Sequence, residues 1–134
     1  MKLNELDWTL KLWKFVEEAY VSVDNGKILK EPERVVYGRE RRLWDGIRVD
    51  ILTQDFAVEV DWAPKYAEAI GQSLLYALYT KKRPGIVLLV NDFKTESKYI
   101  YRCKLVCEQY DIRLWLVDTK KSEVIDHTGA RYKI

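Results

Sequence analysis

Two alternating segments joined by one short turn constrain the fold of this chain most. "RVDIL" at 48–52 and "FAVEVD" at 56–61 are typical of half-buried strands, and Gln54-Asp55 fits a two-residue loop between them. Opposed residues of an antiparallel pair share a face, and a slip of one residue turns every side chain to the other face. The sequence therefore predicts a hairpin with one aliphatic face, made of the opposed pairs Val49–Val60 and Ile51–Val58.

The other face of this hairpin carries charge. The same register places Asp50 opposite Glu59 and Arg48 opposite Asp61. Opposed Cβ atoms lie ~5 Å apart, so Asp50 and Glu59 repel each other unless a cation or a proton lies between them. Arg48 and Asp61 also fit an ordinary cross-strand ion pair on a solvated face, and this alternative stays open.

The next predicted helix, from about Ala63 to Thr80, has a polar stripe. Lys65, Glu68, Gln72 and Tyr76 lie within about 80° of one another on a helix of 3.6 residues per turn. A stripe with Gln and Tyr is less hydrophilic than most solvent faces, which favours the wall of a cleft. The core stripe is expected on the far side, at Ile70, Leu74, Ala77 and Leu78.

The order of predicted elements is αβββαβαβ. A first helix capped by Asn4 runs to about Tyr20, and Asp45-Gly46 is the expected turn of the preceding hairpin. The later elements are a buried strand at 85–90, a helix from about Glu96 to Tyr110 capped by Thr95, a strand at 112–118 and a short final hairpin. This order predicts an α/β fold, with a mixed central sheet flanked by helices and one domain over residues 1–134.

Composition narrows the function. The chain has 134 residues, a net charge of +2, one histidine and no apolar run near the ~20 residues of a membrane span. The N-terminus lacks signal-peptide features, so we expect a cytoplasmic protein without a membrane. Cys103 and Cys107 share one helix face and read as core residues, because zinc needs about four ligands and a disulfide does not suit the cytoplasm.

The carboxylates are suited to a hard divalent cation. Mg²⁺ binds through one or two carboxylates and leaves positions for water and phosphate, and a nearby lysine neutralises charge on a reacting phosphate. Asp50, Glu59 and Lys65 supply these groups. The sequence shows no Gly-rich phosphate loop and no nucleophile elbow that would support a different chemistry.

At these residues the chain resembles the PD-(D/E)xK nuclease superfamily, with its restriction-endonuclease-like core. Asp50 matches the first acidic position and Glu59 the second, while Asp61 stands where lysine is expected. In some branches the lysine migrates to the following helix, and Lys65 matches that placement. Gln72-x-x-x-Tyr76 resembles the glutamine-tyrosine motif of the RecB-type branch.

The resemblance implies a metal-dependent DNA nuclease, of endonuclease or junction-resolving type, that uses Mg²⁺ or Mn²⁺. The implied catalytic residues are Asp50, Glu59, Lys65, Gln72 and Tyr76, and the implied metal ligands are Glu40, Asp50, Glu59 and Asp61. DNA is the implied partner, and the basic residues around the site are the expected contacts: Arg39, Arg41, Arg42 and Arg48. Glu17 or Glu18 on the first helix is a further candidate for the site, with ordinary surface charge as the alternative explanation for both.

Two other functions stay open. Asp61 at the lysine position supports a catalytically inactive nuclease-fold protein that binds DNA or a protein partner. A purely structural protein is the third interpretation. Small nucleases of this fold often pair, so a homodimer is also expected.

Overall fold

The computed structural model describes residues 3–9, 11–12, 38–42 and 48–134, and for residues 38–42 and 48 it describes the backbone. Residues 5–9 and 11–12 are helical. Asn4 and Asp7 begin this helical segment with reciprocal bonds: the Asp7 N–H donates to Asn4 Oδ1 at 2.8 Å, and the Asn4 N–H donates to Asp7 Oδ2 at 3.0 Å. The predicted cap at Asn4 is therefore confirmed, while the helix beyond residue 12 and the Asp45-Gly46 turn lie outside the described residues.

The described strands form one mixed sheet of seven, in the spatial order of the chain. They are β1 (Gly38–Arg42), β2 (Arg48–Leu52), β3 (Phe56–Trp62), β4 (Arg83–Val90), β5 (Arg113–Asp118), β6 (Glu123–Ile125) and β7 (Arg131–Lys133). The pairs β3–β4 and β4–β5 are parallel and the other neighbours are antiparallel. The α/β class, the meander and the final hairpin are confirmed, while the restriction-endonuclease-like core stays a prediction.

The register of the β2–β3 hairpin agrees with strand parity. Ile51 lies opposite Val58 and Leu52 opposite Ala57, as a loop at residues 54 and 55 requires. The Thr53 N–H donates to the Phe56 carbonyl at 2.9 Å and closes that loop.

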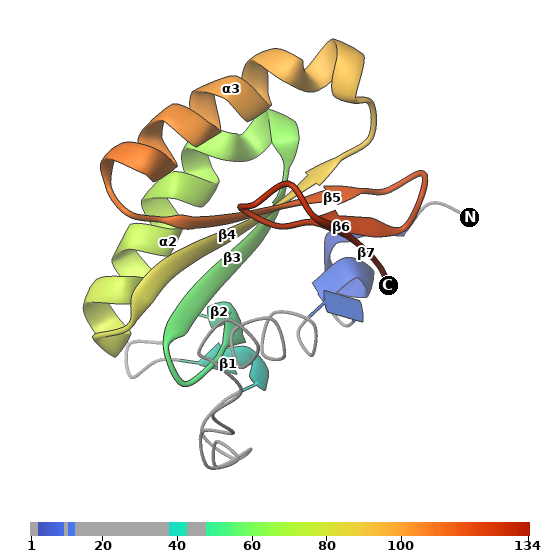
Figure 1. The fold of residues 1–134 in the computed structure, drawn as a ribbon. Helices are drawn as coiled ribbons and strands as arrows, with labels where there is room; N and C mark the ends of the chain where they lie inside the picture. The colour runs from blue at the N-terminus through green and yellow to red at the C-terminus, as the bar shows by residue number, and fades with distance from the viewer. Residues whose placement is uncertain (1–2, 10, 13–37, 43–47) are drawn as a thin grey trace.

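Two helices cover one face of the sheet. A 3₁₀ turn η1 (Ala63–Lys65) leads from β3 into α2 (Tyr66–Thr80), and α3 (Phe93–Gln109) connects β4 to β5. Right-handed crossovers between parallel strands place both helices on the same side, as Figure 1 shows. None of the described helices has the length and apolar character that a membrane crossing requires.

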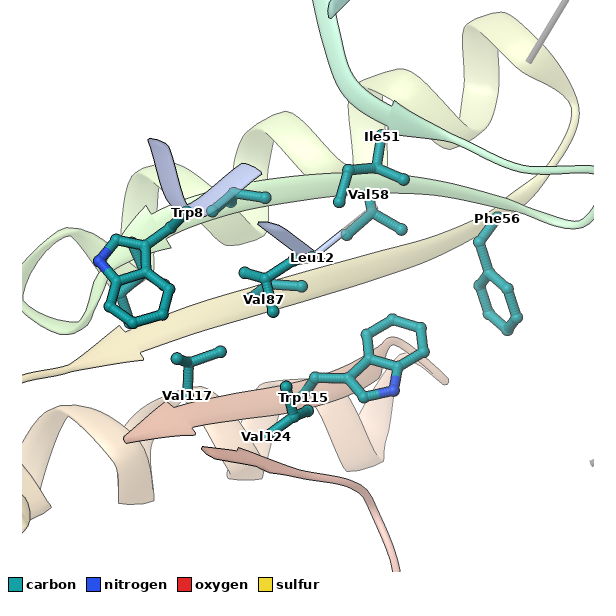
Figure 2. Packing of buried hydrophobic residues seen from close by; sticks show 11 residues of the cluster. Trp8, Leu12, Ile51, Phe56, Val58, Val87, Trp115, Val117 and Val124 are labelled. Atoms are coloured by element: carbon teal, nitrogen blue, oxygen red, sulfur yellow. The ribbon is translucent and has the colours of Figure 1, made fainter. Parts of the chain in front are cut away.

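Each face of the sheet has its own apolar cluster. The helical face buries Ala69, Ile86, Leu88 and both cysteines, Cys103 and Cys107, with side chains of α2 and α3. The opposite face is covered by the N-terminal helical segment. There Trp8 and Leu12 pack against Val58, Val87, Trp115 and their neighbours (Figure 2). The two cysteines are therefore core residues, as predicted.

Helix α2 is rotated relative to the prediction. Its buried residues are Ala69, Ser73 and Tyr76, whereas Leu78 is 77% exposed. The small side chains of Ala69 and Ser73 let the helix approach the sheet, and Gln72 and Tyr76 of the polar stripe lie beside Glu59 of β3. The expected core stripe is confirmed for Ile70 and Leu74, which pack against the cluster on the helical face. It is wrong for Leu78, because the helix presents its small residues to the sheet in preference to this leucine.

Two local predictions also need correction. The helix α3 starts three residues before Glu96, with Asp92 as its cap in place of Thr95: Asp92 Oδ1 accepts from the Lys94 N–H at 3.0 Å. The Glu96 carboxylate accepts from the N–H groups of Asn91 and Asp92, which secures the helix start further. Val49, expected on the aliphatic face of the hairpin, packs with Leu52, Ala57 and Tyr76 because β2 parts from β3 beside it.

Candidate metal centre

Three carboxylates from three elements meet beside the β2–β3 hairpin. Glu5 comes from the N-terminal helical segment, Asp50 from β2 and Glu59 from β3. One oxygen of each lies within 4.8 Å of one oxygen of each other. The predicted proximity of Asp50 and Glu59 is confirmed, and Glu5 joins them. We call these three residues the carboxylate cluster.

The backbone of β3 holds Asp50 in place. The Val60 N–H donates to Asp50 Oδ2 at 2.8 Å, just beyond the last opposed pair, Ile51 and Val58. In a regular ladder that N–H would bond to a backbone carbonyl of the neighbouring strand. Here the side chain of Asp50 takes that role, so the carboxylate is fixed at the point where the two strands part.

Helix α2 holds Glu59. With the Gln72 amide nitrogen turned toward it, this amide donates to both Glu59 oxygens, at 2.7 and 3.1 Å. The Tyr76 hydroxyl also hydrogen-bonds to Glu59. Gln72 and Tyr76, which the sequence predicted to lie beside the site, therefore both contact Glu59. Glu59 is buried, with an exposed fraction of only 4%.

Burial disfavours the ionised form of carboxylates in the cluster. Burial, and then the charge of Asp50, raise the pKa of Glu59 to about 9. Burial and the neighbouring charges of Asp61 and Asp50 raise the pKa of Glu5 to about 7. Burial and the nearby Glu59 also raise the pKa of Tyr76 above its ordinary value. Without a cation, the cluster therefore holds protons that ordinary carboxylates release.

Asp61 and Lys65 lie at one side of the cluster. Asp61 is buried, accepts from the Trp62 N–H at 2.9 Å and shares a hydrogen bond with Glu5. Burial raises the pKa of Asp61, and the charge of Lys65 opposes that rise. The charge of Lys65 also lowers the pKa of Glu5. Lys65 is therefore close enough to act on both carboxylates, while Asp61 contacts the cluster through Glu5.

Glu5 is the residue that sequence reasoning missed. Glu17 and Glu18, the candidates on the first helix, lie outside the described residues. Helical spacing could have identified it. Glu5 precedes Trp8, Thr9 and Leu12 by three, four and seven residues, which puts it on the same helix face as these three buried side chains. A glutamate on the buried stripe of a helix needs a polar partner inside the protein.

The basic residues and Glu40 are placed by their backbones alone. Glu40 lies on β1, and the β1–β2 register puts Arg39 opposite Ile51, Arg41 opposite Val49 and Arg42 opposite Arg48. β1 forms one edge of the sheet. The side chains of these residues lie outside the described part of the structure, and so does the Arg48 side chain of the predicted pair with Asp61.

The donors of the cluster fit a hard cation. All three are carboxylates, and oxygen ligands favour Mg²⁺, Mn²⁺ or Ca²⁺ over the softer metals that thiolates and imidazoles bind. The buried Glu59, with Gln72 supporting its oxygens from outside the cluster, has the second layer of contacts that orients a metal-ligating carboxylate.

Comparison with known proteins finds two viral relatives. The chain is 36% identical, over 86% of its length, to a putative KilA-N domain-containing protein, R878, of Acanthamoeba polyphaga mimivirus, and covers 31% of that protein. It is 30% identical, over 53% of its length, to a second such protein of the same virus, L33, and covers 28% of it. The chain thus spans less than a third of each relative.

No family model matches the chain. No solved structure matches it either.

These comparisons overturn the family prediction. Both relatives are named for a KilA-N domain and neither for a nuclease, so the assignment to the PD-(D/E)xK superfamily and the nuclease function drawn from it are wrong. The physical reason for the error is the looseness of the motif, because two acidic residues at hairpin register and a glutamine-tyrosine pair describe a carboxylate site without naming its use. The arrangement of these residues is unaffected by the correction.

Proposed function

We propose that this chain binds DNA and that Glu5, Asp50 and Glu59 hold a Mg²⁺ or Mn²⁺ ion against the DNA phosphates. The observation that carries the proposal is the meeting of three carboxylates from separate elements, within 4.8 Å of one another, beside strands rich in arginine. The similarity to proteins named for KilA-N, a DNA-binding domain family, supports DNA as the partner.

Electrostatics favours binding through a cation. Once the carboxylate cluster has released its protons, a phosphate that approached it without a cation would meet negative charge at short range. A bound divalent ion offsets that charge and leaves open positions for phosphate oxygens. Glu59 and Asp50 then share their charge with the ion, and Gln72 keeps Glu59 oriented toward it.

The edge of the sheet supplies positive charge. Arg39, Arg41 and Arg42 lie on the edge strand β1, and Arg48 begins the strand that carries Asp50. Lys65 adds a charge from the start of α2. Cationic side chains that contact phosphates release counterions, so binding through them weakens steeply as salt rises.

Fluorescence anisotropy with labelled single-stranded and duplex DNA tests the proposal. We expect tighter binding with Mn²⁺ or Mg²⁺ than with EDTA, and Asp50→Asn should lose this difference while Glu108→Gln, an exposed control on α3, keeps it. The double variant Arg39→Ala/Arg41→Ala should reduce the slope of log Kd against the logarithm of the salt concentration by about 1 to 2. Affinity that is equal in EDTA and Mn²⁺ would refute the role of the ion, and the absence of binding at low salt would refute the role of DNA.

A cleavage assay in the same mixture checks that the protein binds DNA without cutting it. With supercoiled plasmid and Mn²⁺, a protein that only binds leaves the plasmid intact. Nicking that depends on Mn²⁺ and disappears in Asp50→Asn would overturn the binding role in favour of hydrolysis.

A further inference from the structure

A cavity lies at one edge of the sheet, partly lined by Leu3 and Trp8 of the N-terminal segment that also carries Glu5. It measures about 450 Å³ and is lined by Leu3, Trp8, Trp62, Asn91, Thr119, Lys120 and Ser122. Trp62 ends β3, Asn91 follows β4 and Thr119 follows β5, so the cavity lies at the carboxyl ends of three adjacent strands. This edge is the usual ligand-binding edge of a sheet with parallel strands, and the volume is within the range of small-molecule sites.

Two indole rings and Leu3 form the apolar part of this cavity. Trp8 is 3% exposed and packs into the core, so it is a fixed wall. In Figure 2, Trp8 lies near the carboxyl ends of β3 and β4, which are drawn as arrowheads, and Phe56 lies near the opposite end of the sheet. Trp62 is partly exposed. Aromatic side chains of this kind are the platforms on which unpaired bases stack.

Polar groups complete the lining. The Thr119 hydroxyl donates to Asn91 Oδ1 at 2.6 Å, which fixes the Asn91 amide at the cavity. The Thr119 N–H donates to the Val90 carbonyl at 3.1 Å and anchors the loop after β5 to the end of β4. An immobilised amide can hydrogen-bond the edge of a base, and the exposed Lys120 offers positive charge for a phosphate.

The cavity and the carboxylate cluster are connected through the chain. Asp61, which hydrogen-bonds Glu5, directly precedes Trp62 on β3. Glu5 itself precedes Trp8 by three residues, so the two side chains are neighbours on the helical surface. The N-terminal helical segment and β3 thus each contribute residues both to the carboxylate cluster and to the cavity.

We propose that this cavity receives one unstacked nucleobase of the bound DNA strand, with Trp62 stacking on the base, Asn91 contacting its edge and Lys120 contacting a phosphate. The proposal rests on the proposed function and adds a preference to it. The chain should bind a strand that offers an unpaired base more tightly than a fully paired duplex.

Affinities for three DNA probes in Mn²⁺ test this inference: a paired duplex, the same duplex with one bulged base, and a single strand. We expect Trp62→Leu to weaken binding of the bulged and single-stranded probes about tenfold or more and to leave the paired duplex unchanged. Trp62→Phe keeps an aromatic ring and should restore most of the loss. Lys120→Gln should weaken the same two probes, whereas Lys121→Gln, an exposed neighbour outside the cavity lining, should not.

The outcomes separate this inference from the proposed function. Failure of the wild-type protein to bind any probe would overturn the proposed function and the inference together. Mn²⁺-dependent binding of all three probes that Trp62→Leu leaves unchanged, or weakens equally for all three, would overturn the inference alone. Circular dichroism melting of each variant shows that it is folded before its affinity is compared.

Discussion

The N–H of Val60 donates a hydrogen bond to Asp50 Oδ2 at 2.8 Å, where the paired part of β2 and β3 ends. One side chain thus replaces a backbone carbonyl and keeps two parting strands connected. The separation makes room for Glu5 to join Asp50 and Glu59 from the N-terminal helical segment. The carboxylate cluster is therefore a product of the strand geometry as well as of residue type.

Substitutions at Asp50 should separate its structural role from metal binding. Asp50→Asn keeps a side-chain oxygen that can accept from Val60, so we expect urea unfolding in EDTA close to that of the wild type. Asp50→Ala leaves the Val60 N–H without this acceptor and should lower the free energy of unfolding by about 1–3 kcal/mol. Both variants should lose Mn²⁺ affinity in calorimetric titration. Equal stability of Asp50→Ala and Asp50→Asn would show that the hydrogen bond to Val60 contributes nothing.

The space around two glycines predicts opposite effects on stability when each is replaced by alanine. A Cβ on Gly85 would lie 3.0 Å from Val58 Cγ2 and 3.1 Å from Trp115 Cζ3, both in the core. We therefore expect Gly85→Ala to destabilise the protein by about 1–3 kcal/mol through overpacking. Gly71 lies within α2 with nothing within 4 Å of an added Cβ, so Gly71→Ala should stabilise it by about 0.5–1 kcal/mol. Thermal melts of the two variants check this, and shifts of the same sign would contradict it.

Strand parity predicted the centre of the site from sequence. The two-residue loop at 54 and 55 fixes which residues face each other, so the proximity of Asp50 and Glu59 needed no knowledge of the rest of the fold. The glutamine-tyrosine spacing likewise placed Gln72 and Tyr76 on one side of a helix, and both reach Glu59. Local periodicity is sufficient for contacts of this kind.

Contacts that depend on tertiary packing were beyond such reasoning. Glu5 reaches the cluster because the N-terminal helical segment packs across the sheet face, and no local pattern sets that position. The exposure of Leu78 was also missed, because this leucine fits a core stripe better by hydropathy than Ala69 and Ser73 do. Close approach of the helix to the sheet favoured the small residues, and Leu78 is exposed as a result.

Protonation of Glu59 predicts how stability changes with pH in the absence of metal. The pKa of Glu59 is raised from 4.5 to about 9 by burial and by Asp50. Between these values the folded protein keeps a proton that the unfolded chain has released, so the free energy of unfolding falls as pH rises. Urea unfolding in EDTA should show this decline for the wild type and a shallower one for Glu59→Gln, which does not titrate. Saturating Mn²⁺ should flatten the wild-type curve, and identical pH slopes for wild type and variant would contradict the assignment.

The amide of Gln72 should strengthen metal binding without contacting the ion. It donates to both oxygens of Glu59, at 2.7 and 3.1 Å, and so holds the carboxylate in one orientation. Loss of a supporting contact of this kind typically lowers metal affinity about 10- to 100-fold, so we expect that change in the Kd for Mn²⁺ of Gln72→Leu by calorimetry. Gln109→Leu makes the same replacement at an exposed position at the end of α3 and should leave the Kd unchanged. Because Gln72 is itself exposed, its replacement should have little effect on folding, and a melt in EDTA checks this directly. Mn²⁺ affinity that survives in Gln72→Leu would mean that Glu59 is oriented by Tyr76 and the strand alone.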